Sequence, residues 1–335
     1  MGIKAVFLAE PDNKYITRVF DESTMRRLKK TVNLYSEYIH RHNARHHAEA
    51  LKDVEVAFST WGIPHFTAAE IRTWFPNLKA LFYAAGSVQR FARQFLSCGV
   101  ILVSSWAANA VPVAEYTAAQ IVLANKGYFL TSRQYKLGYA EARRLMNLYP
   151  GNYGARVGII GAGMIGRKVI GLLRASDLEI DVFDPFLPDA AAAELGVRKT
   201  DLVDLFRRCD TISNHLANLP ETVGILRSEH FDKMLPHATF INTGRGAQVV
   251  EADLIRALRE VPTRTAVLDV THPEPVQDDS ELLRLDNVIL TPHIAGSLGL
   301  EVARMGVVAA EEFECFTRGQ PLRYQVTEDM LATMA

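Results

Sequence analysis

The segment of residues 157–166, Val-Gly-Ile-Ile-Gly-Ala-Gly-Met-Ile-Gly, constrains this chain more than any other stretch. An apolar run that reads as a buried strand leads into a glycine-rich turn, and the turn opens a helix. Gly161 permits a tight turn, Gly163 lets the backbone approach a pyrophosphate, and Gly166 lets the helix pack closely on the strand. The helix start offers free N–H groups to the phosphates, so the spacing predicts a dinucleotide-binding site. Its expected cofactor contacts are Gly161, Gly163, Met164, Ile165 and Gly166.

A second strand-like run, residues 179–183, ends at Asp184, which lies 18 residues after Gly166. A carboxylate about 20 residues past the fingerprint is expected to accept hydrogen bonds from the ribose hydroxyls. It would repel a 2′-phosphate, and residues 185–187, Pro-Phe-Leu, supply no arginine to compensate. The sequence therefore favours NAD over NADP as the cofactor. A glycine-rich turn in some other strand–helix unit is the alternative interpretation.

Composition limits the class of partner. The chain has 335 residues, enough for about two domains. Its 37 basic and 38 acidic residues give a net charge of −1, so nothing indicates binding to nucleic acid or to an acidic membrane surface. A small molecule is the expected partner.

Cysteine usage and the N-terminal residues bear on the compartment. Three widely spaced cysteines form no disulfide or metal pattern, which suits a reducing environment. The apolar run at residues 5–9 is too short for a signal peptide or a membrane span, so the cytoplasm is the expected location. Residues 40–47 hold four histidines among arginines, without carboxylates or cysteines at ligand spacing, and we interpret them as a solvated face. No metal is expected.

Strand-like and helix-like runs alternate along the chain, which indicates parallel βα units. The expected strands are residues 3–8, 54–59, 79–83, 100–103, 179–183, 211–215, 239–242, 265–270 and 288–290. Thr67 and Glu70 form a capping box that predicts a helix running to Trp74. We expect residues 104–112 to be the crossing between two domains, with an apolar helix beginning near Val113.

Residues 84–88, Ala-Ala-Gly-Ser-Val, follow an expected strand with small side chains and free backbone N–H groups. Ligands of open α/β sheets bind at the carboxyl ends of strands. Gly86, Ser87 and Val88 are therefore candidates to hold a substrate carboxylate, with an ordinary βα turn as the alternative.

Three polar groups, Arg245, Glu274 and His293, fall just beyond other expected strands, at one edge of the predicted sheet. Reduction of a ketone by hydride leaves charge on oxygen, so it needs a proton donor, an orienting carboxylate and a fixed cation. His293, Glu274 and Arg245 fit these roles in turn. The planar fork of Arg245 suits a 2-oxo carboxylate.

The order of these motifs resembles the D-2-hydroxyacid dehydrogenase family, and especially its phosphoglycerate dehydrogenase-like members. The resemblance rests on the fingerprint, Asp184, residues 234–246 and 269–275, and Thr-Pro-His-Ile-Ala-Gly at 291–296. It implies two doubly wound parallel-sheet α/β domains with a cleft between them. Residues 113–298 would form a Rossmann NAD-binding domain, and residues 1–112 with 299–335 a flavodoxin-like substrate domain. A helix at 301–318 would return to the substrate domain.

The resemblance also assigns residue roles. Arg245 matches the group that binds the substrate carboxylate. Glu274 matches the carboxylate that adjusts the pKa of the histidine, and His293 matches the histidine that transfers the proton. Asn109 matches the family's hinge segment and is expected to contact substrate. Further cofactor contacts implied by the family pattern are His215, Ala217, Thr243, Asp269 and Gly296. The chain departs from that pattern at residues 214–220, where the family usually has Leu-His-x-Pro-Leu-Thr, and at residues 85–89, where it often has Gly-x-Gly-Val-Asp.

The sequence thus predicts an NAD-dependent oxidoreductase that interconverts a D-2-hydroxy acid and its 2-oxo acid, and a homodimer formed through the NAD-binding domain. An NAD(H)-sensing binding protein resembling the corepressors of the same fold is the alternative from another class. A formate dehydrogenase is a nearer one, but that family has Gln where Glu274 stands. No motif names the 2-hydroxy acid.

Overall fold

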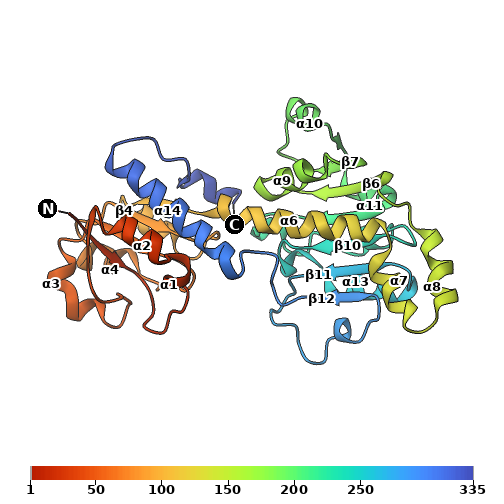
Figure 1. Cartoon of the computed structure of the whole chain (residues 1–335), viewed down its shortest axis with the longest axis horizontal. Coiled ribbons are helices and arrows are strands. Elements are labelled where there is room, and N and C mark those ends of the chain that lie inside the picture. The colour runs from red at the N-terminus through yellow and green to blue at the C-terminus, as the bar shows by residue number, and fades with distance from the viewer. Residues whose placement is uncertain (1, 335) are drawn as a thin grey trace. The chain divides into compact units, whose positions relative to one another are not determined.

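The computed structural model describes residues 2–334, which divide into two compact units. Unit 1 contains the described residues up to Asn109 together with those from Ser297 onwards, and unit 2 is Ala110–Gly296. From the sequence, we expected boundaries after residues 112 and 298. Each unit is built on its own parallel sheet (Figure 1).

Unit 1 has a six-stranded sheet in the order β13-β5-β4-β3-β1-β2, parallel except for β13. Its strands are β1 (Ile3–Phe7), β2 (Val32–Leu34), β3 (Val56–Ser59), β4 (Ala80–Tyr83), β5 (Ile101–Ser104) and β13 (Gln325–Val326). The central strands β3 and β4 are buried along their whole length, as is typical of parallel strands covered on both faces. Four of these strands were expected. The sequence analysis missed β2 and β13, which have only three and two residues.

The helices of unit 1 cover this sheet. They are α1 (Ile16–Val19), α2 (Glu22–Leu28), α3 (Ala48–Leu51), α4 (Ala68–Trp74), α5 (Ala92–Leu96) and α14 (Val302–Thr317). The capping box of α4 is confirmed: the Glu70 N–H donates to Thr67 Oγ1 at 3.2 Å, and the Thr67 N–H donates to Glu70 Oε2 at 2.8 Å. The helix expected at residues 301–318 is α14, which packs on β4 and α1.

Unit 2 has seven parallel strands in the order β12-β11-β10-β9-β6-β7-β8. They are β6 (Tyr153–Ile160), β7 (Asp177–Phe183), β8 (Arg198–Lys199), β9 (Thr211–Asn214), β10 (Thr239–Asn242), β11 (Thr265–Leu268) and β12 (Val288–Leu290). The order reverses between β6 and β9, which pair directly. Ligands of such sheets bind where the order reverses, so the loops after β6 and β9 are the expected place for a cofactor. The predicted fold of two parallel-sheet α/β domains is confirmed.

The long helix α6 (Trp106–Asn125) begins in unit 1 and continues from Ala110 in unit 2. The shorter helices of unit 2 are α7 (Tyr128–Tyr135), α8 (Tyr139–Leu145), α9 (Met164–Leu173), α10 (Asp189–Leu195), α11 (Leu202–Arg208), α12 (Ser228–Phe231) and α13 (Glu251–Glu260). The prediction of a helix beginning near Val113 is wrong, because α6 already begins at Trp106 and contains Pro112. Pro112 is the seventh residue of this helix, which continues on both sides of it although proline supplies no N–H.

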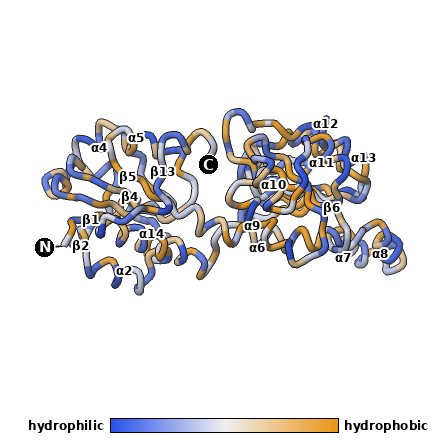
Figure 2. The backbone as a smooth tube through the Cα atoms, turned by 90° about the horizontal axis from the view of Figure 1, so that it is seen from above, coloured by the Kyte–Doolittle hydropathy of each residue, from blue (hydrophilic) through white to orange (hydrophobic). Residues whose placement is uncertain are grey.

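Hydrophobic stretches follow the strands inside each unit, whereas α7 and α8 form a hairpin that projects from the body of unit 2 (Figure 2). Within residues 2–334, no helix is both long and apolar enough to cross a membrane. The histidine-rich segment ends in a single 3₁₀ turn, Ala44–His47, in which His47 Nδ1 lies 2.9 Å from the Tyr35 hydroxyl.

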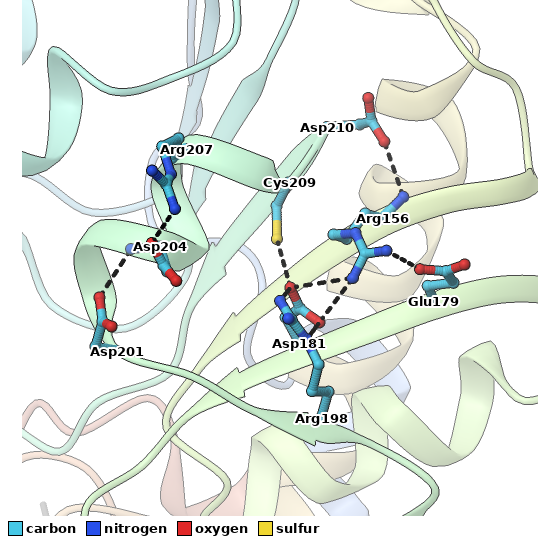
Figure 3. Close-up of polar contacts among 9 residues, drawn as sticks. All are labelled: Arg156, Glu179, Asp181, Arg198, Asp201, Asp204, Arg207, Cys209 and Asp210. Atoms are coloured by element: carbon cyan, nitrogen blue, oxygen red, sulfur yellow. Dashed lines mark hydrogen bonds and ion pairs between the residues drawn. The ribbon is translucent and has the colours of Figure 1, made fainter.

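A buried carboxylate ties three strands of unit 2 together (Figure 3). Asp181 on β7 is almost fully buried, and Arg198 Nε on β8 donates to Asp181 Oδ1 at 2.8 Å. Arg156 Nη1 on β6 donates to the same oxygen at 3.2 Å, and Cys209 Sγ lies 3.8 Å from Oδ2. Burial and the neighbouring Asp181 raise the pKa of the Cys209 thiol, so it stays protonated and can donate. We call Asp181, Arg156, Arg198 and Cys209 the Asp181 cluster.

Candidate active site

The fingerprint turn of unit 2 connects β6 to α9. Gly161 has φ +92°, and a Cβ there would lie 2.9 Å from the His215 carbonyl oxygen. A Cβ at Gly166 would lie 2.1 Å from the Gly161 oxygen. Both positions therefore require glycine. A Cβ at Gly163 would instead meet no described atom within 4 Å, so this side of the turn, beside the start of α9 at Met164, has room for a phosphate.

Asp184 lies against the same turn. Its Oδ2 accepts a hydrogen bond from the Ala162 N–H at 2.8 Å, and its Oδ1 accepts one from the Phe186 N–H at 2.8 Å. These bonds fix the carboxylate beside the turn. A carboxylate oxygen can accept more than one hydrogen bond, so both oxygens retain capacity for ribose hydroxyls.

A buried amide network, which the sequence analysis missed, joins the loops that follow β9 and β10. Gln248 Nε2 donates to the carbonyl oxygens of Leu216 and Ala217 at 2.9 and 2.8 Å. Asn214 Nδ2 donates to Gln248 Oε1 at 2.6 Å and to Asn242 Oδ1 at 3.0 Å. The sequence feature that could have indicated this network is an asparagine at the end of each of two buried strands, Asn214 of β9 and Asn242 of β10. The network rigidly places the loop that carries Arg245.

Arg245 follows β10 and is held by this network. Its N–H donates to Gln248 Oε1 at 3.2 Å, and its Nη1 donates to the Gly244 carbonyl oxygen at 2.7 Å. Burial lowers the pKa of the Arg245 guanidinium, and the negative charge of Glu274 opposes that shift. No carboxylate among residues 2–334 forms an ion pair with Arg245. A desolvated guanidinium with unused donors suits a substrate carboxylate.

Glu274 and His293 form a pair at the same sheet edge, with His293 Nδ1 2.6 Å from Glu274 Oε1. Both side chains are 44% exposed, so the imidazole is open to a ligand. We assign the Nδ1 proton to the hydrogen bond with the carboxylate, which leaves Nε2 as the exchangeable position. His293 has φ +55°, a conformation that few residues other than glycine adopt. Such strain is often found at functional sites.

Asp269 supports the loop that carries His293. Its Oδ1 accepts hydrogen bonds from Thr291 Oγ1 at 2.6 Å and the Ile294 N–H at 2.8 Å, and its Oδ2 accepts one from the Ala295 N–H at 2.9 Å. Asp269 is buried, and its carboxylate faces this loop. Thr243 is buried as well, with its hydroxyl 3.0 Å from that of Thr117. Asp269 and Thr243 were expected to contact the cofactor. In the structure both are buried at the carboxyl edge of the sheet, where their side chains lie within hydrogen-bond distance of other protein groups.

His215 differs from His293 in its surroundings. It is buried, with Nε2 2.9 Å from the Ser213 hydroxyl. Burial lowers the pKa of His215 to about 3, so this ring is neutral near pH 7 and cannot serve as the proton donor. Its N–H donates to the Ile160 carbonyl oxygen at 2.7 Å. The backbone of His215 therefore joins the end of β9 to the end of β6, where the strand order reverses.

The expected substrate loop lies in unit 1, after β4. Ser104 Oγ lies 2.8 Å from the carbonyl oxygens of both Ala85 and Gly86, and Thr60 Oγ1 donates to the Ala84 oxygen at 2.8 Å. These buried hydroxyls, which the sequence analysis missed, hold the loop carbonyls inward. In the described part of the chain, the N–H groups of residues 85–88 have no acceptor. Free amides in succession can bind an anion.

Asn109 flanks this loop within unit 1. Its Oδ1 accepts a hydrogen bond from the Ser297 N–H at 3.1 Å, and its Nδ2 would lie 3.6 Å from a Cβ at Gly86. The structure therefore places Asn109 against Gly86, in the loop that also contains Ser87 and Val88.

All other expected site residues belong to unit 2 and lie in or beside the loops at the carboxyl edge of its sheet. They are Gly161, Gly163, Met164, Ile165, Gly166, Asp184, His215, Ala217, Thr243, Arg245, Asp269, Glu274, His293 and Gly296. Among residues 2–334, no group of three or more His, Cys, Asp or Glu side chains could hold a metal ion.

Residues 119–295 match the family model described as D-isomer specific 2-hydroxyacid dehydrogenase, NAD binding domain. The D-3-phosphoglycerate dehydrogenase of Archaeoglobus fulgidus is 31% identical over 228 residues, covering 68% of this chain and 43% of that protein. The chain thus spans about two-fifths of the length of the curated relatives it matches.

Solved structures share the fold across the whole chain. A phosphoglycerate oxidoreductase from Rhizobium etli has a TM-score of 0.80 at 21% identity, covering 99% of this chain and 100% of that one. The apo D-mandelate dehydrogenase of Rhodotorula graminis has a TM-score of 0.79 at 20% identity, covering 97% of both chains.

Proposed function

This chain belongs to the D-isomer specific 2-hydroxyacid dehydrogenase family, and from that membership and the site geometry we propose that it interconverts a D-2-hydroxy acid and the corresponding 2-oxo acid with NAD. The observation that carries the proposal is the Glu274–His293 pair at 2.6 Å, on the carboxyl edge of the sheet whose fingerprint turn is fitted to a dinucleotide. The family's NAD-binding domain covers residues 119–295, which include both features.

Bound NADH supplies a hydride to the substrate carbon, and NAD accepts one in the reverse direction. In reduction, His293 donates the Nε2 proton to the carbonyl oxygen, which becomes the hydroxyl group. Glu274 stabilises the positive charge of the imidazole and fixes its orientation through Nδ1. Arg245 binds the substrate carboxylate through its planar pair of donors.

The proposal is tested by following NADH oxidation with a panel of 2-oxo acids that includes glyoxylate, the smallest of them. We expect turnover with at least one of them. Tight NADH binding without turnover of any 2-oxo acid would contradict the proposal and favour a nicotinamide-sensing binding protein.

We predict that NADH is preferred over NADPH by about 100-fold in kcat/KM, since bringing a 2′-phosphate against a carboxylate costs several kcal/mol. Asp184→Asn should reduce this preference about tenfold, because it removes the charge and keeps an acceptor oxygen. Asp189→Asn is the matched control, as Asp189 pairs with Lys199 at 2.7 Å on the exposed start of α10. Equal kcat/KM for NADH and NADPH in the unmodified enzyme would show that Asp184 does not distinguish a ribose hydroxyl from a 2′-phosphate.

We also propose a homodimer formed through unit 2, because the α7–α8 hairpin and the residues beside it expose several large aromatic and aliphatic side chains to water. They include Tyr128, Tyr135, Leu137, Tyr139 and Met146. The rings of Tyr135 and Tyr139 pack edge to face, with centroids 5.6 Å apart. The cytoplasm is the compartment we propose, since the three cysteines are all free.

Light scattering should give twice the 37.3 kDa chain mass at micromolar concentration. The double variant Leu137→Glu, Tyr139→Glu should give the monomer mass, because it places two charges in the buried contact. Leu300→Glu, at a side chain that is 95% exposed in unit 1, should remain dimeric. A monomeric parent protein would refute the proposal.

A further inference from the structure

Two aromatic side chains stand near the carboxylate-binding loop of unit 1. Strands β1, β3 and β4 are parallel neighbours, so the loops that follow them share one sheet edge. Tyr15 follows β1 and Trp61 follows β3, while residues 85–88 follow β4. Trp61 comes directly after Thr60, whose hydroxyl bonds the Ala84 oxygen at 2.8 Å. The aromatic pair is therefore next to the free amides along this edge.

The two rings are held together by one side-chain amide. Asn13 Nδ2 donates to the Trp61 carbonyl oxygen at 2.7 Å, and Asn13 Oδ1 accepts from the Tyr15 N–H at 2.8 Å. The rings meet edge to face, with centroids 5.4 Å apart and planes at 67°. Gly62 has φ +78°, and a Cβ there would come within 2.9 Å of Asn13 Nδ2, so the turn leaves room for this amide. Hydrogen bonds between Asn13 and the backbone of both residues therefore fix the relative position of Tyr15 and Trp61.

The aromatic pair also retains apolar surface for a ligand. Tyr15 is 45% exposed, and Trp61 is half-buried with one part of its ring packed against the core of unit 1. On the opposite side of the amide loop, towards β5, Asn109 already lies against Gly86. On the side of β3 and β1, a group that extends from a carboxylate bound at residues 85–88 can make apolar contacts with Tyr15 and Trp61.

The charge at this edge argues against a phosphorylated substrate. Residues 10–15, 60–63 and 84–88 include two carboxylates, Glu10 and Asp12, one lysine and no arginine. Proteins usually recognise a phosphate group with arginine or lysine clusters or with a helix N-terminus. These three segments therefore offer no cluster of basic side chains to a phosphate, and the first arginine after residue 88 is Arg90.

We infer that Tyr15 and Trp61 form the wall that receives the substrate side chain, with Asn13 as the residue that positions them. The site then takes 2-oxo and 2-hydroxy acids with an aromatic or large apolar side chain in preference to phosphorylated ones. Aromatic side chains favour such a group through edge-to-face contact and through burial of apolar surface. The inference rests on the proposed function, because it names the substrate class of the same site.

The test compares kcat/KM for three acids with NADH: glyoxylate, phenylpyruvate and 3-phosphohydroxypyruvate. Glyoxylate has no side chain, so its turnover reports the proposed function alone. We expect kcat/KM for phenylpyruvate to exceed that for 3-phosphohydroxypyruvate by about tenfold or more, the range that pocket contacts usually give. In Trp61→Ala, the ratio of kcat/KM for phenylpyruvate to that for glyoxylate should fall about 10- to 100-fold.

Two further variants test the contributions of Tyr15 and Asn13 separately. Tyr15→Ala removes a ring that is 45% exposed, so the fold is preserved while the phenylpyruvate ratio falls. Asn13→Ala should raise KM for phenylpyruvate with little change in kcat, because it loosens the wall without touching the reacting atoms. Trp74→Leu is the control for loss of a tryptophan, since Trp74 packs on Phe66 at the end of α4 and the ratio should stay unchanged.

The outcomes separate the two ideas. Turnover of glyoxylate and 3-phosphohydroxypyruvate without turnover of phenylpyruvate would overturn the inference and leave the proposed function standing. An unchanged ratio in both Trp61→Ala and Tyr15→Ala would overturn it as well. No turnover of these three acids or of any other acid in the panel would overturn the proposed function, and the inference with it.

Discussion

His293→Ala should lower kcat for 2-oxo acid reduction about 100- to 10,000-fold, which is the usual contribution of a positioned acid. Cofactor binding should change little, because the imidazole is paired with Glu274 and not with the fingerprint turn. Stopped-flow measurement of NADH binding, beside steady-state turnover, checks both expectations. Normal turnover in His293→Ala would mean that the proton comes from another group.

Glu274→Gln serves as the partner experiment. The amide can keep a hydrogen bond to Nδ1 but lacks the negative charge that stabilises the imidazolium. We expect a smaller loss of kcat than in His293→Ala. The same imidazole gives its proton in reduction and takes it back in oxidation, so kcat should fall in both directions. A loss in only one direction would contradict this assignment.

Arg245→Ala provides a contrast within the same site. The guanidinium is assigned to the substrate carboxylate, so its loss should appear mainly as a raised KM for the 2-oxo acid. Arg245→Lys should recover only part of the affinity, because lysine cannot offer two donors in one plane. A lower kcat at unchanged KM would instead place Arg245 at the transition state alone.

Replacing both arginines of the Asp181 cluster should destabilise the protein by about 3–5 kcal/mol, because it leaves the buried Asp181 carboxylate without a counter-ion. The variant is Arg156→Met with Arg198→Met, and the free energy of unfolding is measured by urea titration. Adding Asp181→Asn to this double variant should recover most of the loss, since it removes the stranded charge (Figure 3).

Lys199→Met is the control, because Lys199 on the same strand makes only an exposed ion pair with Asp189. Its cost should be within about 1 kcal/mol. If the triple variant were as unstable as the double variant, the arginines would stabilise the sheet by packing and not by charge.

The sequence predicted most features that depend on local order. The fingerprint, the long strands and the α4 capping box all consist of neighbouring residues whose types fix their conformation. Asp184 was expected from its distance along the chain, and the structure shows it bonded to the turn through Ala162. The family, the fold class and the NAD-binding domain are confirmed.

The remaining features depend on contacts between distant segments. Gln248 reaches the loop after β9 across more than 30 positions of the chain, and Ser104 reaches Gly86 only because β4 and β5 are neighbours. Nothing in the local sequence distinguishes such a glutamine or serine from a solvated one. Strands of two residues, such as β8, leave no periodic pattern. The start of α6 was missed because proline usually interrupts a helix, whereas α6 continues through Pro112.

The placement of α14 affects how this chain can fold while the ribosome makes it. Phe313 on this helix packs edge to face on Phe58 and Phe82, with ring centroids 5.3 and 5.6 Å apart, although unit 2 lies between them in the sequence. The contiguous unit 2 can therefore fold while unit 1 still lacks a helix that closes its core. Synthesis leaves β3 and β4 partly uncovered until α14 emerges, and this interval is when aggregation or chaperone binding is most favoured.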